Sequence, residues 1–219
     1  MLSGTAQAAP AGVKGFDANV TITPAQADAF WDAGFRFAIR YVGRTQMASH
    51  DLAADEAAML LARGFGVMPV QHVLGGEWMA TGDLGTEYGA NAARFCQEIG
   101  FPPGVNVWLD LESVSTQAAT ADVSAYCHNW YSQVAAAGYV PGVYIGWQPG
   151  LTGQQLYDLP FSHYWAAYNV DGVSTPHPRG YQLVQSSGSG YVGSLGTDVY
   201  DVDTTHVDAE GGQVLWLKQ

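Results

Sequence analysis

The chain has 219 residues, of which 47% are hydrophobic and 13% charged, a composition that excludes an intrinsically disordered protein and suffices for one sizeable core. Its 20 acidic and 8 basic residues give a formal net charge of −12, which argues against nucleic acid or an anionic membrane surface as a partner. No apolar run approaches the roughly 20 residues that a membrane-spanning helix needs, so we expect no membrane insertion.

Residues 1–12 are predicted to be a flexible N-terminal segment, followed by a single domain at residues 13–219. The segment is small and polar, and Ala6 to Pro10 are similar to the end of a secretory signal. The basic start and apolar middle of a complete signal are missing. We therefore expect a protein that is secreted or associated with the cell envelope, the alternative being a mobile arm of a larger assembly.

Four glycines punctuate the first part of the domain: Gly34, Gly64, Gly100 and Gly138. Each follows an amphipathic, alanine-rich stretch and precedes an aromatic residue. This pattern is typical of a helix that ends at a left-handed glycine before a strand begins. The repetition predicts four strand–helix units.

The starts of the helices agree with these ends. Thr23, Pro24 and Gln26 supply a capping hydroxyl, a first-turn proline and a capping-box glutamine. Helices are predicted at Pro24–Ala33, at Leu52–Arg63 after a cap at Asp51, at Asp83–Ile99, and after a cap at Thr120. The intervening runs are almost continuously apolar, as in covered parallel strands, and predict strands at Val13–Asp17, Phe35–Val42, Gly66–Val73, Val105–Glu112 and Tyr139–Gly146.

After Gly146 the pattern weakens. A short helix is predicted at Gln154–Tyr157, and strand-like stretches at His163–Tyr168, Tyr181–Gln185 and Thr197–Val202. The Gly/Ser-rich residues 186–190 are expected to form a loop. The second half therefore combines strands with irregular connections.

Polar residues indicate how the strands are arranged, because they fall at or near the C-terminal ends of strands, where the active sites of barrels form. These residues are Asp17, Arg40, Gln71, Asp110, Glu112 and Tyr144. An open nucleotide-binding sheet would need a glycine-rich loop after an early strand, and residues 15–18 offer none. The predicted fold class is α/β, an irregular TIM-like (β/α) barrel with regular βα units in the first half and reduced helices in the second.

The run Val105–Glu112 ends in two carboxylates one residue apart. Alternate side chains of a strand share a face, so Asp110 and Glu112 are expected to project together. Buried carboxylates without partners are costly, so a functional interpretation is favoured over a structural one.

Five short motifs carry a resemblance to a known family. They recur in the same order in family 25 glycoside hydrolases, the lysozymes that cut bacterial wall glycan. The chain is still more similar to their relatives, the glycoside-hydrolase-like domain known as domain-of-unknown-function family 1906, from Val13 to its end. The motifs are Gly15-Phe16-Asp17, Asp110-Leu111-Glu112, Trp165-Ala166-Ala167-Tyr168, Gln185-Ser186-Ser187 and Asp201-Val202-Asp203.

The resemblance implies a cleft with Glu112 as general acid, Asp110 as its partner carboxylate, Asp17 from the first strand, and either Asp201 or Asp203 from the last. Glycoside cleavage needs one carboxyl group to protonate the leaving oxygen and another group to stabilise or attack the anomeric centre. Crowded carboxylates raise one another's pKa, which keeps one acid protonated. In the structural alternative, Asp17 ties a loop and the last-strand aspartate pairs with Arg40.

Other side chains near strand ends are candidates for substrate contacts. Flat rings stack on sugar faces, and of these Trp147 is favoured, whereas each aromatic has core packing as its alternative. The predicted substrate-binding residues are Arg40, Gln71, Tyr144, Trp147, Trp165, Tyr168 and Gln185.

No cofactor and no metal are expected. The histidines at positions 50, 72, 128, 163, 177 and 206 show no zinc-ligand spacing, although His72 could line the cleft. Residues 201–206 begin like a calcium loop but lack its glycine and glutamate. Cys96 and Cys127 fall on helical apolar stripes and are predicted to be core residues, with a single disulfide as the alternative.

Two functions follow from these observations. The first is hydrolysis of a β-linked cell-wall glycan, peptidoglycan-like, by a monomer. The second keeps the barrel without catalysis, as a carbohydrate-binding or envelope-associated module. The carboxylate set favours the first, and the missing basic surface favours the second.

Overall fold

The computed structural model describes residues 1–170, 172–176, 178–187, 190–196 and 198–219. Its strands are β1 (Thr5–Ala8), β2 (Lys14–Ala18), β3 (Phe37–Val42), β4 (Gly66–Gln71), β5 (Asn106–Leu111), β6 (Val140–Ile145), β7 (Tyr164–Ala166), β8 (Leu183–Ser187), β9 (Tyr200–Thr205) and β10 (Leu215–Lys218). Its helices are α1 (Pro24–Asp32), α2 (Ala54–Ala62), α3 (Gly82–Ile99), α4 (Thr120–Ala136), α5 (Gly153–Tyr157) and the 3₁₀ turn η1 (Gly172–Ser174).

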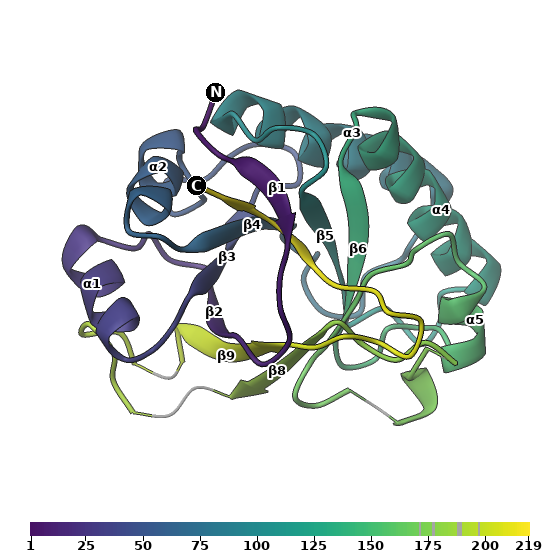
Figure 1. Cartoon of the computed structure of the whole chain (residues 1–219). Helices are drawn as coiled ribbons and strands as arrows, with labels where there is room; N and C mark the ends of the chain where they lie inside the picture. Colours follow the sequence, from purple (N-terminus) through teal and green to yellow (C-terminus); the bar gives the residue numbers. More distant parts are fainter. Residues whose placement is uncertain (171, 177, 188–189, 197) are drawn as a thin grey trace.

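Strands β2 to β9 close into a barrel, in the order β4-β3-β2-β9-β8-β7-β6-β5, and β5 pairs back onto β4. Helices α1 to α4 follow the first strands in the expected alternation and lie around the outside (Figure 1). The predicted α/β, irregular TIM-like barrel is therefore confirmed, including the reduced helices of its second half.

One strand of the barrel runs against the others. The neighbouring pairs from β2 through β8 are parallel, whereas β9 is antiparallel to both β2 and β8. The start of β9 therefore lies at the same end of the barrel as the C-terminal ends of the parallel strands. Its register places Asp201 opposite Asp17 and Asp203 opposite both Gly15 and Gln185.

The helix ends follow the sequence signals closely. Thr23 and Gln26 form the predicted capping box of α1. Gly34, Gly64, Gly100 and Gly138 all adopt φ between 87° and 103°, a left-handed conformation that only glycine adopts without strain.

Two predicted helix starts are wrong. α2 begins at Ala54 rather than Leu52, because the Asp51 side chain accepts a hydrogen bond from the Ala48 N–H outside the helix. Thr120 lies inside α4, whose cap residue is Ala119. The strand predicted at Thr197–Val202 begins at Tyr200, as β9, and Thr197 lies outside the described residues. In the loop predicted at 186–190, Ser186 and Ser187 belong to β8, and residues 188 and 189 lie outside the described residues.

The N-terminal segment differs from a free flexible arm. Residues Thr5–Ala8 form β1 and pair antiparallel with β10 along their length, while Leu217 of β10 pairs with Val67 of β4. Trp216 of β10 packs against the Phe37 ring, with centroids 5.8 Å apart. The two chain ends thus cover the barrel at the N-terminal ends of its parallel strands.

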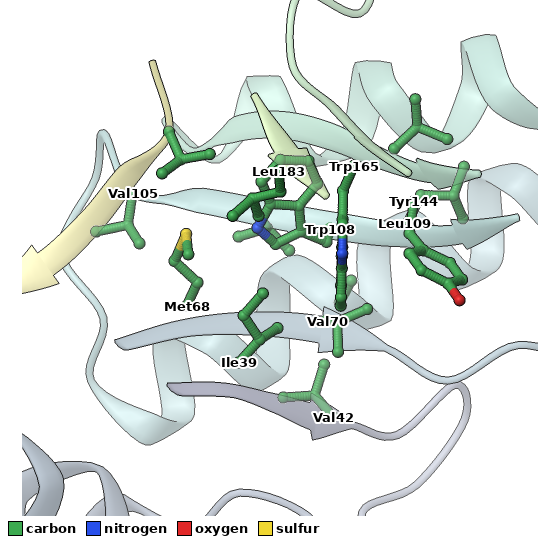
Figure 2. Close-up of a cluster of buried hydrophobic side chains, with 14 of the residues drawn as sticks. Ile39, Val42, Met68, Val70, Val105, Trp108, Leu109, Tyr144, Trp165 and Leu183 are labelled. Atoms are coloured by element: carbon green, nitrogen blue, oxygen red, sulfur yellow. The ribbon is translucent and has the colours of Figure 1, made fainter. Parts of the chain in front are cut away.

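The barrel interior is filled by large side chains. Figure 2 shows Trp108 and Trp165 among Ile39, Met68 and Val70, and all five are buried. The two indole rings meet edge to face, with centroids 5.9 Å apart. Outside the barrel, Cys96 and Cys127 are buried free thiols, so the prediction of core residues is confirmed. Among the described residues, no helix has the length and apolar character to cross a bilayer.

Helices α3 and α4 pack closely because α3 presents glycine at the contact. A Cβ at Gly85 would overlap the backbone of Tyr126, and one at Gly89 would lie 2.7 Å from the Trp130 carbonyl oxygen. Backbones in such contact leave no room for a methyl group.

We therefore expect Gly85→Ala to destabilise the fold by about 1 to 3 kcal/mol through overpacking. Helix propensity alone predicts the opposite sign, a gain of about 0.5 to 1 kcal/mol. The free energy of unfolding in urea distinguishes the two. Gly75→Ala, whose Cβ meets nothing within 4 Å, is the control; a more stable Gly85→Ala chain would contradict the packing account.

Candidate active site

The inner face of β5 carries Trp108 and Asp110, and Glu112 continues the alternation just past its end. The register with β6 sets Trp108 beside Gly142, and Asp110 beside Tyr144. A Cβ at Gly142 would overlap the Trp108 ring. Glycine in β6 therefore makes room for the indole that lies beneath the acids.

Glu112 lies against a second glycine, Gly146, which directly follows β6. A Cβ at Gly146 would overlap both Cβ and Oε2 of Glu112. The Glu112 carbonyl accepts a hydrogen bond of 2.8 Å from Trp78 Nε1, and the next residue, Ser113, adopts φ +53° while its N–H donates to the Trp147 carbonyl. A non-glycine residue at positive φ costs free energy and is often found at functional sites. The backbone around Glu112 is thus fixed from both sides.

Asp17 and Asp203 reach the cleft from the opposite side of the barrel wall. Asp17 is 5% exposed and Asp203 is fully buried. Asp17 accepts a hydrogen bond of 2.8 Å from Gln185 Nε2, and Gln185 Oε1 accepts one of 3.0 Å from the Tyr144 hydroxyl. This chain of bonds joins β2, β8 and β6 across the end of the barrel.

The choice between Asp201 and Asp203 rests on depth. Both lie on the inward face of β9, because alternate residues share a face and their partners are Asp17 and Gly15. Asp203 is completely buried, whereas Asp201 is partly exposed and lines an opening beside Asp17. Asp203 is therefore the deep member of the cluster and Asp201 lies at its mouth.

Burial shifts the acids of the cluster toward their protonated forms. It raises the pKa of Asp17 to about 7, against the lowering effect of the Gln185 hydrogen bond. Burial also raises the pKa of Asp110 well above 3.8, and the charges of Glu112 and Asp17 raise it further. Burial raises the pKa of Asp203 well above 3.8 too, and the charge of Asp17 adds to this effect. Burial raises the pKa of the partly exposed Glu112 as well. The cluster therefore holds protons where ordinary carboxyl groups do not.

Some of these carboxyl oxygens lack a well-formed hydrogen bond. Within the described residues, Asp110 Oδ1 and both oxygens of Asp203 are buried without a well-formed hydrogen bond. The Trp165 indole lowers the pKa of Asp203, but less than burial raises it. Buried polar atoms of this kind are rare and costly, and they concentrate at functional sites.

Two residues predicted to contact substrate point away from the cleft. Arg40 is fully buried and donates to Glu56 of α2 (2.7 Å) as well as to the Ala18 and His50 carbonyls, so it also has no need of the last-strand aspartate as a partner. Gln71 donates to the Gly43 and Tyr88 carbonyls and accepts from Trp130 Nε1 at 2.8 Å. These predictions need correction, because both side chains lie on outward positions of β3 and β4, under the helices.

The aromatic candidates divide by depth. Trp165 is fully buried and Tyr144 is 8% exposed, with ring centroids 4.5 Å apart beneath the acids. Trp147 and Tyr168 are 53% and 60% exposed. Trp147 also lines a surface hollow of about 530 Å³ with residues 148–152. Of the four predicted aromatic contacts, Trp147 and Tyr168 are therefore the ones accessible enough to stack on a bound sugar.

Tyr41 was not predicted as a site residue. It lines the opening of about 120 Å³ beside Asp17, and its pKa is raised well above 10 by burial and by the charges of Asp17 and Asp110. β3 is covered on both faces, so no sequence signal distinguishes the inward Tyr41 from the outward Arg40.

The chain resembles proteins that share this barrel. A family model described as "Rv2525c-like, glycoside hydrolase-like domain" matches residues 28–207. The crystal structure of the Mycobacterium tuberculosis Tat-secreted protein Rv2525c with L-tartrate has a TM-score of 0.70 at 19% identity, covering 93% of this chain and 99% of that one. A comparison with curated proteins finds no match.

Lysozymes are also among the similar structures. The bacterial lysozyme from Streptomyces coelicolor has a TM-score of 0.59 at 16% identity, covering 92% of this chain and 95% of that one. A family 25 glycosyl hydrolase from Bacillus anthracis has a TM-score of 0.56 at 13% identity, with 91% of each chain covered. At these identities the likeness establishes the shared fold.

The raised pKa of Asp17 predicts a pH dependence of stability. Between its ordinary value of 3.8 and about 7, the folded chain binds more protons than the unfolded chain, so the free energy of unfolding falls as pH rises. From pH 5 to pH 7 the wild type should lose about 2 kcal/mol more than Asp17→Asn. Urea unfolding at both pH values measures this, and Asp122→Asn, on the exposed face of α4, should behave as wild type. An equal loss in Asp17→Asn would contradict the assignment.

Proposed function

Because the chain belongs to the Rv2525c-like, glycoside hydrolase-like family, we propose that it hydrolyses a β-linked, peptidoglycan-like cell-wall glycan. The observation that carries the proposal is the convergence of Asp17, Asp110, Glu112 and Asp203 at one end of the barrel, with the pKa of each raised. A glycosidase needs a carboxyl group that is still protonated near neutral pH beside one that carries charge.

Glu112 is the proposed general acid. It is the most accessible of the four acids, its backbone is fixed by Trp78 and Trp147, and burial raises its pKa. It donates its proton to the leaving glycosidic oxygen. Asp110 lies deeper on the same face, accepts a hydrogen bond from the Val73 N–H, and stabilises or attacks the positive anomeric centre.

Asp17 and Asp203 support this pair rather than compete with it. Burial raises the pKa of both, and Asp17 raises the pKa of Asp203 further, whereas the hydrogen bond with Asp203 lowers the pKa of Asp17. Their protonated form limits the negative charge around Asp110. Through Gln185, Asp17 also fixes the Tyr144 hydroxyl that lies beside Asp110 in the register of β5 and β6.

The exposed aromatics supply the glycan contacts. Trp147 directly follows Gly146, against which Glu112 lies, so a sugar stacked on the indole has its linkage near the acid. Export to the cell envelope is part of the proposal, supported by the likeness to a Tat-secreted protein. A monomer suffices, because the proposed acids all come from one chain.

A second function is supported by one observation. The opening beside Asp17 measures about 120 Å³, whereas ordinary ligand pockets measure about 300 to 1,000 Å³. An opening this small beside the acids favours a catalytically silent module that binds glycan along the Trp147 hollow instead. Binding of the chain to insoluble wall glycan without release of reducing ends distinguishes this module from a hydrolase.

Glu112→Gln tests the role of the acid. Glutamine keeps the shape but cannot supply the proton, so kcat/KM on peptidoglycan should fall by at least about 100-fold. Newly formed reducing ends, labelled by reduction and separated by chromatography, are the measurement. Glu87→Gln, an exposed glutamate on α3, is the matched control. Equal turnover by wild type and Glu112→Gln would exclude the role.

Trp147→Ala tests the sugar platform. Loss of a stacking ring worth about 0.5 to 1.5 kcal/mol should raise KM by about 2- to 10-fold and leave kcat within about 2-fold. The reducing-end assay at varied glycan concentration separates the two constants. Val207→Ala, exposed beyond the far end of β9, should leave both unchanged. A lower kcat at unchanged KM would contradict a binding role.

A further inference from the structure

Three potential metal ligands meet outside the acid cluster, at the same end of the barrel. His50 and Asp51 lie in the connection between β3 and α2, and His72 directly follows β4. These strands are parallel neighbours, and the His72 N–H donates to the Val42 carbonyl at 3.1 Å. The sequence spacing predicts no metal site, whereas strand pairing brings together three ligand-type side chains from two separate connections.

The side chains converge on one carboxylate oxygen. Asp51 Oδ1 lies 2.7 Å from His72 Nε2 and 3.8 Å from His50 Nε2. All three ligand atoms lie within 4.8 Å of one another. Among the histidine, cysteine, aspartate and glutamate side chains of the described residues, this is the group of three that lies close enough to hold one metal ion. Ligands about 2.0 to 2.2 Å from one Zn²⁺ in tetrahedral geometry are separated by about 3.3 Å, between the two observed separations.

Neighbouring groups hold each ligand in place. The buried Asp51 accepts the Ala48 N–H with Oδ2 at 2.7 Å, which directs Oδ1 toward the histidines. Arg40 donates to the His50 carbonyl at 2.9 Å, and the Tyr41 ring stacks on His72 with centroids 4.6 Å apart. Such outer contacts are what orient the ligands of metal sites.

The group also has room for an ion and for solvent. The three residues line a hollow of about 340 Å³ with residues 43–46 and Ala48. The His50 side chain is 53% exposed, so its ring is free to turn toward the other two ligands. Arg44 lines the same hollow and opposes a cation, but its guanidinium is bonded to the Val73 carbonyl.

We propose that His50, Asp51 and His72 form a binding site for a divalent first-row transition ion of the zinc class, with water at the remaining position. Two imidazoles and one carboxylate select such ions over Ca²⁺ and Mg²⁺, which take mainly oxygen ligands. The site is separate from the acids. The Tyr41 ring stacks on His72 and also lines the opening beside Asp17, so the ion forms part of one wall of the cleft.

The test uses the tag-free, chelator-treated chain with Zn²⁺ in titration calorimetry and with Co²⁺ in visible absorption. We expect one site per chain, and at least about 10-fold weaker binding by His50→Ala. Since His50 is exposed, the metal-free melting temperature of His50→Ala should equal that of wild type. At the same Zn²⁺ concentration, the melting temperature should rise more in wild type than in the variant.

His128→Ala is the matched control, because His128 is exposed on α4 away from the site. It should bind both ions as wild type does. A wild-type chain that binds neither ion would overturn the proposal. Equal affinity in wild type and His50→Ala would overturn it as well, since binding would then be elsewhere.

Discussion

The structure depends on how the barrel tolerates several carboxyl groups removed from water at one of its ends. Asp110 is almost completely buried and Asp203 is completely buried. Within the described part of the chain, one oxygen of Asp110 and both oxygens of Asp203 lack a well-formed hydrogen bond. Removing a charged carboxylate from water is expensive, so the groups retain protons instead. Beneath them, the buried side chains of Trp108 and Trp165 pack edge to face in the barrel interior (Figure 2). The packed core thus determines the electrostatics of the site.

The antiparallel strand β9 completes the cluster. In a barrel of parallel strands only the C-terminal strand ends reach the cleft, whereas Asp201 is the second residue of β9 and Asp203 the fourth. Because β9 runs in the opposite direction, Asp201 lies level with Asp17 on β2, and Asp203 lies level with Gly15. Gln185 of β8 hydrogen-bonds to Asp17 of β2 across β9. The reversed strand thus adds its aspartates to acids that come from parallel strands.

Sequence signals were sufficient where they were local. Glycine-terminated helices and apolar strands predicted the first half of the barrel, and β5 carries Asp110 with Glu112 just past its end. The errors at Arg40 and Gln71 share a cause: strands buried on both faces show no alternation of polarity, so position near a strand end does not reveal which face a side chain occupies. Tyr41, one residue from Arg40, was missed for the same reason. Predicting that Asp203 lies deeper than Asp201 would have required knowing that β9 runs antiparallel to its neighbours.

The central claim is that burial keeps carboxyl groups of this cluster protonated near neutral pH. Carboxyl ¹³C resonances of aspartate and glutamate, followed from pH 3 to pH 9 and assigned through single substitutions of the four acids, test it most directly. The account predicts that Asp17 titrates near pH 7 and that Asp110 and Asp203 titrate well above the ordinary value of 3.8. Titration of all four acids at ordinary carboxyl pKa values would contradict it, since the cluster would then be solvated and fully charged.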